Sequence, residues 1–369
     1  MTNPLLAEWA TPFALAPFDE ITDVDFAPAF EAALAEARAE VAAIADNPAP
    51  PTFANTVEAL EFSGKALNRV LSVFFTVAGA DSSPERQALQ RAFAPKLAAW
   101  SSELYGNKAL YARIEALWQA GDTLGLTPEE ARLLLLTRRA FARAGAALSG
   151  EAETRMRAIM ARLAELGTAF TQNLLADEAG WRMDLSEADL DGLPDFVVEN
   201  AREAGREAGL DTPVITLSRS LIVPFLQFSN RRDLRKRAFE AWAARGANGG
   251  ETDNRAIAAE TLALREERAA LLGYTSFAAY KLETQMAGTP EAVRALLMAV
   301  WEPARAQADN DAERLTAMMR EDGINGDLEP WDWRYYAEKR RQAEHDLDEA
   351  AVKPYLSLDA MIGAAFDCA

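Results

Sequence analysis

The sequence contains one histidine, His345, and one cysteine, Cys368, among 369 residues. The zinc-binding helix motif H-E-x-x-H needs two histidines four residues apart, so that both imidazoles face one metal ion. The segment from Arg341 to His345 matches the inverted motif H-x-x-E-H except at its first position, where an arginine would repel a cation. The sequence therefore predicts no metal ligand in this chain. We expect His345 to be a solvated imidazole between Glu344 and Asp346.

Patterns for nucleophilic catalysis are also missing from the sequence. A Ser-His-Asp or Cys-His arrangement would have to use the same His345, and there is no G-x-S-x-G turn. Cys368 has no basic neighbours that would activate its thiol. The 57 acidic residues are too many for the sequence to select one catalytic pair of carboxylates. We therefore predict no catalytic residue in this chain.

Two further segments could bind anions. Gly246–Gly250 is glycine-rich, but it lacks the lysine and the strand-to-helix context of a phosphate-binding loop, so a flexible turn between helices is the favoured interpretation. Arg231–Arg237 is the one basic cluster. As a helix turn it spreads charge around the cylinder, which favours a solvated or salt-bridged helix face over a nucleic-acid site.

An aromatic cluster runs from Pro330 to Tyr336. One interpretation is aromatic packing between helices, and the other is the wall of a groove that holds an extended substrate. The candidate residues for such a substrate groove are Trp331, Asp332, Tyr335 and Tyr336.

The elements that would position these residues are helices. Thr22 is a candidate N-cap for a helix whose apolar residues recur every three or four positions as far as Ile44. A second helix is expected to start near Asn55 and to continue through Phe75. Ser83-Pro84-Glu85 and Thr127-Pro128-Glu129-Glu130 predict two more helix starts. Later helices are expected at 231–245, 253–272, 290–320 and 332–341, with helical sequence resuming from Pro224 and a loop at 322–327.

The expected fold class is all-α, with a small β-ribbon insertion near 181–217. Strand-like alternation is confined to 181–185 and 213–217. We expect an extended arm over 1–20, a helical domain over 21–178 and a mostly helical second region over 179–369 that is incomplete at its C-terminus.

Composition limits the function classes. The chain has 38 basic and 57 acidic residues, a net charge of −19, which disfavours binding to nucleic acid or to an anionic membrane surface. The single cysteine excludes an intrachain disulfide and fits a reducing compartment. We see no targeting segment and no membrane span, so the cytoplasm is the expected location.

Several segments, in this order over some 350 residues, resemble the thimet oligopeptidase family of zinc metallopeptidases. Within it, the chain is most similar to the N-terminal part of bacterial peptidyl-dipeptidases, also called dipeptidyl carboxypeptidases, and of their relative oligopeptidase A. The matching segments are 3–6, 51–56, 264–274, 285–291 and 330–339. The continuation Leu347–Leu356 favours the peptidyl-dipeptidase branch.

The resemblance implies a neurolysin-like, mostly helical, ellipsoidal two-lobed fold with a deep channel. It also implies Zn²⁺ as the cofactor and short peptides as substrates, cut internally by oligopeptidase A or released as C-terminal dipeptides by peptidyl-dipeptidases. In the family, the H-E-x-x-H helix and the downstream glutamate ligand lie beyond the point where this sequence ends. None of those residues can be assigned here.

The last nine residues, 361–369, continue an apolar helical pattern without a C-cap, which is typical of an interrupted reading frame or a shortened chain. We therefore expect part of a peptidase that is inactive alone. A non-catalytic helical module that binds peptides or partners is the alternative, and assembly with a separate C-terminal catalytic half is a third possibility. Apolar stripes left uncovered would favour self-association.

Overall fold

The computed structural model describes residues 3–345 and 352–369. Asp346 and the start of the Leu347–Leu356 motif lie outside the described residues. The chain divides into two compact units, 1–158 and 159–369, and this division falls inside one long helix, α7 (Gly150–Gly180). The division differs from the predicted one after residue 178, because the later turns of α7 pack with the second unit: Ile159 and Leu166 form an apolar cluster with Leu264.

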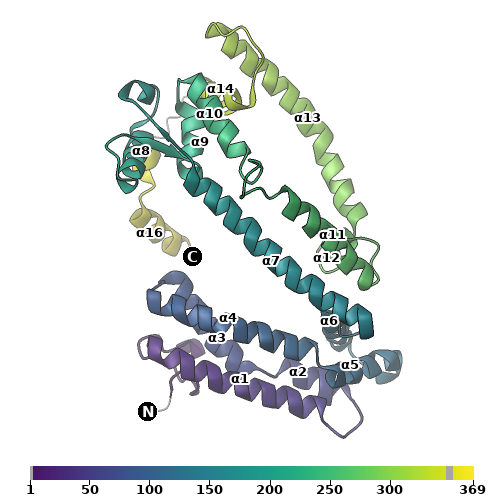
Figure 1. Ribbon diagram of the computed structural model, residues 1–369. Coiled ribbons are helices and arrows are strands. Elements are labelled where there is room, and N and C mark those ends of the chain that lie inside the picture. The colour runs from purple at the N-terminus through teal and green to yellow at the C-terminus, as the bar shows by residue number, and fades with distance from the viewer. Residues whose placement is uncertain (1–2, 346–351) are drawn as a thin grey trace. The chain divides into compact units, whose positions relative to one another are not determined.

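The first unit consists of helices and short helical turns (Figure 1). Before its first α-helix lies the 3₁₀ turn Pro12–Ala14. Its further elements are α1 (Asp23–Ala45), a π-helical turn (Ala54–Glu58), α2 (Ala59–Glu61), α3 (Lys65–Ala80), α4 (Pro84–Tyr105), α5 (Lys108–Ala120), a 3₁₀ turn (Gly121–Leu124), α6 (Pro128–Ala144) and the start of α7.

Local capping signals fix several helix starts in this unit. The backbone N–H and hydroxyl of Thr22 both donate to Asp25 in the first turn of α1. Ser83 Oγ accepts from the N–H of Arg86 at the start of α4, and Thr127 forms a reciprocal capping box with Glu130 at the start of α6. These predicted starts are confirmed.

The predicted continuous helix from Asn55 to Phe75 is wrong. The chain turns at Ser63 and Gly64 between α2 and α3, and Gly64 takes a φ of +68°, which a residue with a Cβ rarely adopts. The apolar spacing continues across the break, so periodicity alone could not show it.

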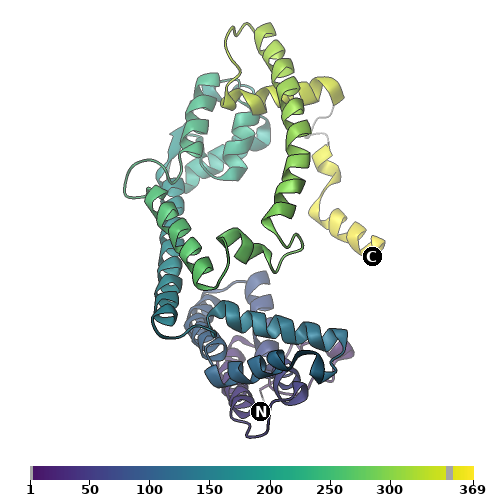
Figure 2. The same cartoon turned by 90° about the vertical axis from the view of Figure 1, so that its right-hand side faces the viewer.

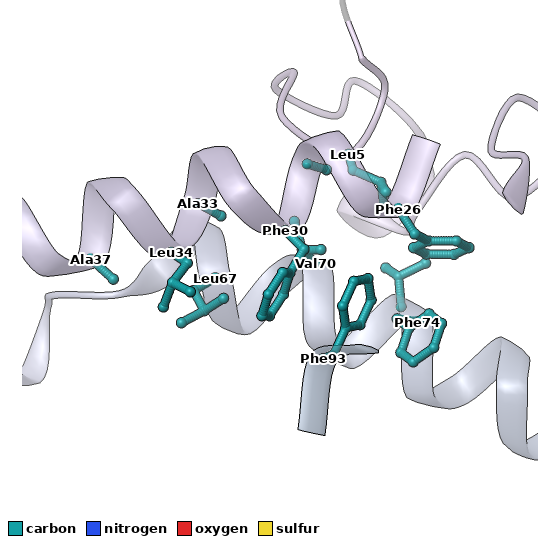
Figure 3. Close-up of a cluster of buried hydrophobic side chains, with 12 residues drawn as sticks. Leu5, Phe26, Phe30, Ala33, Leu34, Ala37, Leu67, Val70, Phe74 and Phe93 are labelled. Carbon is teal, nitrogen blue, oxygen red and sulfur yellow. The ribbon is translucent and has the colours of Figure 1, made fainter. Parts of the chain in front are cut away.

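Phenylalanines from three helices form the core of this unit (Figure 3). Phe30 of α1 stacks on Phe93 of α4 with ring centroids 4.2 Å apart. Phe74 of α3 meets Phe26 and Phe93 edge-on, at 5.2 and 5.0 Å. Each of these side chains is almost fully buried, so the three helices share one continuous apolar interior.

The second unit is helical apart from one small ribbon. After α7 come β1 (Arg182–Asp184), a 3₁₀ turn (Glu187–Leu190), α8 (Asp195–Glu207), β2 (Val214–Thr216), α9 (Arg219–Phe228), α10 (Arg232–Ala243), α11 (Arg255–Leu271), α12 (Phe277–Leu282), α13 (Pro290–Glu321), α14 (Pro330–His345), a 3₁₀ turn (Lys353–Tyr355) and α16 (Leu358–Cys368). The all-α class with a minor β insertion is confirmed.

The ribbon is antiparallel, with Arg182 opposite Thr216, Met183 opposite Ile215 and Asp184 opposite Val214. Met183 and Ile215 are buried with Ile222 and Phe225 of α9 and with Ala238 of α10. The ribbon thus packs against one side of the α9–α10 pair. The sequence expectation placed the resumption of helix at Pro224, whereas α9 begins at Arg219 and contains Pro224.

No helix among the described residues is long and apolar enough to cross a bilayer.

Candidate functional site

The residues of the predicted aromatic cluster lie where α9, α10 and α14 meet, within the second unit. The chain turns from α9 into α10 at Ser229 and Asn230, and α14 begins at Pro330. Because α14 packs on both earlier helices, the start of α14 comes beside the start of α10 although the two are about a hundred residues apart in sequence.

At the centre of this junction is the carboxylate of Asp332, which is completely buried. Arg232 binds it with two hydrogen bonds, from Nε to Oδ1 at 2.9 Å and from Nη2 to Oδ2 at 2.6 Å. Arg235 donates a third, from Nη2 to Oδ1 at 3.1 Å. The backbone N–H of Glu329 adds a fourth, at 3.2 Å to Oδ2. We call Arg232, Arg235 and Asp332 the Asp332 cluster.

Arg235 is the second buried charge, with 1% of the residue exposed. Its other nitrogens donate to the carbonyls of Ser229 at 2.6 Å and Trp331 at 3.2 Å. Its guanidinium also lies over the ring of Tyr335, 4.0 Å from the centroid. The buried arginine is therefore bound on several sides, as a buried charge requires.

Opposing effects set the pKa of Asp332. Burial alone would raise it, but the hydrogen bonds from Arg232, from the backbone of Glu329 and from Arg235 favour the carboxylate more strongly. The pKa of Asp332 is consequently below its usual value, and the pKa of Arg232 is raised by the same pairing. The Asp332 cluster holds its charges as a fixed ion pair, so it is poorly suited to accept or release a proton near neutral pH.

The four residues predicted for a substrate groove lie in different surroundings. Trp331 borders an open hollow of about 650 Å³ together with Asn230, Arg231, Arg232, Asp233, Lys236 and Glu329. Tyr335 is partly exposed and donates to Asn230 Oδ1 at 2.8 Å. Asp332 is buried in the cluster described above, and Tyr336 is buried against Leu315 and Met319 of α13. Burial raises the pKa of Tyr336.

The structure brings these four residues to one helix start, and Trp331 is the one that borders the hollow. Packing between helices accounts for Asp332 and Tyr336, because both are buried between α14 and its neighbours. The assignment of the four residues to a peptide groove stays a prediction.

The basic cluster Arg231–Arg237 is salt-bridged at its start. Arg231 pairs with Asp189 and, at 2.8 Å, with Asp233. Arg232 is partly exposed and Arg235 is buried. The expectation of a helix face that is solvated or salt-bridged therefore fits the first two arginines. It misses the burial of Arg235, because no local pattern reveals a partner that lies 97 residues away.

Sequence reasoning also missed a second polar cluster on α14. Glu338 is almost fully buried and accepts from Arg341 at 2.6 and 2.8 Å, from Gln227 of α9 at 2.8 Å and from Gln342 at 3.0 Å. These bonds, above all the two from Arg341, lower the pKa of Glu338. With Asp332, this carboxylate joins α14 to the preceding helices.

Gly192 permits the close approach of the loop that supports Asn230. A Cβ on Gly192 would lie 2.6 Å from the amide of Asn230, and its φ is +81°. Asn230 in turn donates to Asp191 Oδ2 at 2.9 Å and accepts from Tyr335. Glycine is needed here for space as well as for conformation.

The glycine-rich segment Gly246–Gly250 is a turn between α10 and α11, as predicted. It is held in place, since the N–H of Gly246 and the amide of Asn248 both donate to Asp177, at 2.6 and 2.9 Å. The hydroxyl of Thr252 binds the same carboxylate and, with the N–H of Gly246, lowers its pKa.

The donor groups of the described residues do not fit a zinc ion. His345 is exposed at the end of α14, and its neighbour Glu344 pairs with Arg340, which also binds Asp311. Over residues 3–345 and 352–369, no group of three or more histidine, cysteine, aspartate or glutamate side chains could hold a metal ion. No step of chemistry is therefore assigned to a metal in this chain.

Comparison with known proteins adds to this picture. The model of Peptidase family M3 matches residues 225–365, a range that includes α10, α13 and α14. The resemblance to this peptidase family is confirmed.

The chain is 37% identical over 365 residues to dipeptidyl carboxypeptidase of Salmonella typhimurium, covering 98% of this chain and 53% of the relative. It is 36% identical over 362 residues to dipeptidyl carboxypeptidase of Escherichia coli, with the same two shares. It is 29% identical over 372 residues to oligopeptidase A of Escherichia coli, covering 100% of this chain and 54% of the relative. The chain thus spans about half the length of the curated relatives that it matches.

Proposed function

We propose that this chain is a portion of a zinc metallopeptidase of the peptidyl-dipeptidase type, which releases dipeptides from the C-termini of short peptides. The observation that carries the proposal is the similarity over 98% of the chain to two dipeptidyl carboxypeptidases. The match of the Peptidase family M3 model to residues 225–365 adds support. The finer assignment to dipeptide release follows from the names of these two relatives.

We further propose that the 369-residue chain alone does not hydrolyse peptides. A metallopeptidase uses its ion to polarise the scissile carbonyl and to lower the pKa of the attacking water. That ion is normally held by at least two imidazoles, or by several thiolates, whereas this chain offers one imidazole and one thiol. In this proposal the chain contributes helical scaffold, and the zinc ligands come from polypeptide that this chain does not contain.

The test is a dipeptide-release assay on the purified chain with added zinc. A short peptide is incubated with the chain alone, with the separately produced remainder of the Escherichia coli dipeptidyl carboxypeptidase, and with both. We expect release only from the mixture, and we expect a chelator to abolish it. Release by the chain alone would overturn the proposal of inactivity. A mixture that stays inactive although the two pieces bind each other would count against a complementary catalytic half.

A second candidate function, peptide binding without catalysis, is favoured by the hollow beside Trp331. The indole ring of Trp331 and the exposed ammonium of Lys236 lie on its border, which suits an extended peptide that carries a carboxylate, although Asp233 and Glu329 also line it. Calorimetric titration with a short peptide and with its C-terminal amide tests this function. Saturable binding that is weakened by the amide and by Trp331→Ala would support it, and titrations without heat at millimolar peptide would dispose of it.

A further inference from the structure

The turn between α10 and α11 contains an Asn–Gly step, Asn248–Gly249, and both of these residues are exposed to water. Asparagine is a chemically labile residue, above all when glycine follows it. Glycine has no side chain that would hinder its backbone nitrogen from reaching Cγ of the preceding asparagine. Figure 2 shows this turn in green beside the second half of α7, in teal.

The structure holds both reacting groups of this step in hydrogen bonds. The side-chain amide of Asn248 donates from Nδ2 to Asp177 Oδ2 of α7 at 2.9 Å. The backbone N–H of Gly249 donates to Asp253 Oδ2 at 3.0 Å. While these bonds last, the amide and the nitrogen that would attack it are directed to two different carboxylates. The reaction therefore needs an open form of the turn, in which both bonds are broken.

The same carboxylate of Asp177 also holds the rest of the turn. The N–H of Gly246 donates to Oδ2 at 2.6 Å, and the hydroxyl of Thr252 donates to Oδ1. These bonds, above all the one from Thr252, and the bond from Asn248 hold the pKa of Asp177 below its usual value. Asp177 is thus a carboxylate whose partners in the turn are all donors. We call Asp177, Gly246, Asn248 and Thr252 the turn clamp.

We propose that Asn248 is a modification site at which deamidation opens the turn clamp irreversibly. In the open turn, the backbone nitrogen of Gly249 loses its proton to hydroxide and bonds to Cγ of Asn248. The Cγ–Nδ2 bond then breaks, and the nitrogen leaves as ammonia. Water opens the resulting succinimide ring to aspartate or isoaspartate. The net reaction exchanges an amide for a carboxylate, consumes water and changes no oxidation state.

The product cannot rebuild the clamp. A donor at position 248 becomes a second carboxylate, which would face Asp177 across the 2.9 Å that separated donor and acceptor. Two carboxylates this close destabilise each other's charge, so the modified turn stays away from Asp177. The buried side chain of Asn254 binds α7 without Asp177 and keeps its contacts. We therefore expect the release to be confined to 246–252.

The inference does not depend on the proposed peptidase function. It rests on contacts between residues 170 and 254, which all lie within the second unit.

The first test follows deamidation of the full chain by peptide mapping with mass spectrometry at mildly alkaline pH. The internal reference is Asn325–Gly326, the other Asn–Gly step of the sequence, in the loop between α13 and α14. We expect Asn248 to convert in the folded chain, but more slowly than in urea. Asp177→Ala should raise the rate at Asn248 about tenfold or more, because the turn loses its hydrogen bonds to a charged group. The rate at Asn325 should stay unchanged.

The second test asks whether the product releases the turn. Asn248→Asp should speed amide hydrogen exchange over 246–252 about tenfold or more, because the clamp is lost. Asn248→Gln is the matched control, since it keeps an uncharged amide, and it should change the exchange far less. Asn248→Asp combined with Asp177→Asn should regain most of the protection, because the donor and the acceptor have only exchanged places.

Three results would overturn the proposal. The first is a folded chain in which Asn248 keeps its amide over many times the half-life that the same residue shows in urea. The second is equal conversion of Asn248 in the wild type and in Asp177→Ala. The third is unchanged exchange over 246–252 in Asn248→Asp. Circular dichroism equal to that of the wild type shows that a variant is folded, and if Asp177→Ala is not, the first and third results still decide.

Discussion

At the scale of single residues, the buried charges of the Asp332 cluster hold α14 against the α9–α10 turn. Asp332 and Arg235 are both removed from water, which is costly unless every charge keeps its partners. Arg232, Arg235 and two backbone carbonyls meet that requirement together. The cluster fixes the start of α14 on the α9–α10 turn, and so it places Trp331 at the hollow.

Removing the charge of Asp332 should therefore strongly destabilise the folded chain. Asp332→Asn leaves Arg235 buried without its carboxylate, and we expect the free energy of unfolding to fall by about 3–5 kcal/mol. Asp233→Asn is the matched control, since Asp233 pairs with Arg231 at the surface and its loss should cost about 0–1 kcal/mol. Urea unfolding of both variants measures the difference. Equal losses of unfolding free energy in the two variants would show that the buried ion pair stabilises the fold no more than the surface pair does.

The lowered pKa of Asp332 makes this contribution depend on pH. A carboxyl group whose pKa is lower in the folded chain stabilises it fully above the unfolded pKa of about 3.9. That stabilisation is lost as the pH falls through the folded pKa. We expect the difference between wild type and Asp332→Asn to be constant from about pH 5 to 7 and to shrink below about pH 4. Urea unfolding at a series of pH values tests this, and a difference that is unchanged at pH 3 would contradict it.

Sequence alone could not reveal this cluster. The basic run and the aromatic run were both visible, but ion pairs across 97 to 100 residues leave no local pattern. The burial of Glu338 is hidden for the same reason, because its partner Gln227 lies 111 residues away. What the sequence does show is that charged and aromatic residues gather at one helix start.

At the scale of elements, helix boundaries that depend on residues close together in sequence were predicted more accurately than the other boundaries. The starts of α4 and α6 depend on residues within one turn, and both were predicted. The helix break at Gly64 was missed because the apolar spacing continues across it. The start of α9 before Pro224 was missed because a proline normally stands near a helix start. A short ribbon of 182–184 with 214–216 could be predicted because the first strand alternates and the second is rich in β-branched residues.

The capping box at the start of α6 gives a prediction at this scale. Thr127→Ala removes the hydroxyl that accepts from the N–H of Glu130, and we expect a loss of about 1 kcal/mol in the free energy of unfolding. Thr127→Ser keeps the hydroxyl and should retain most of the stability. Thr76→Ala is the control, because Thr76 is exposed within α3 and binds only the carbonyl of Ser72. An equal loss in Thr127→Ala and Thr76→Ala would refute the capping role.

At the scale of the whole chain, there are two compact units with separate apolar cores. The model of Peptidase family M3 matches residues 225–365 of the second unit, whereas the similarity to dipeptidyl carboxypeptidase covers 98% of the chain. Three acidic groups on or beside α14, Asp332, Glu338 and Asp311, are already bound to arginines. Such carboxylates are poor ligands for an additional cation, since their charge is already compensated. The proposal that this chain serves as scaffold rests on that pairing and on its single imidazole.

Zinc stoichiometry tests this central claim most directly. The purified chain is equilibrated with equimolar zinc at micromolar concentration, separated from free metal by gel filtration, and analysed for zinc beside the intact Escherichia coli dipeptidyl carboxypeptidase. We predict well below one zinc per chain, with no change on adding a chelator. One zinc that stays with the chain through gel filtration, and that a chelator then removes, would contradict the account.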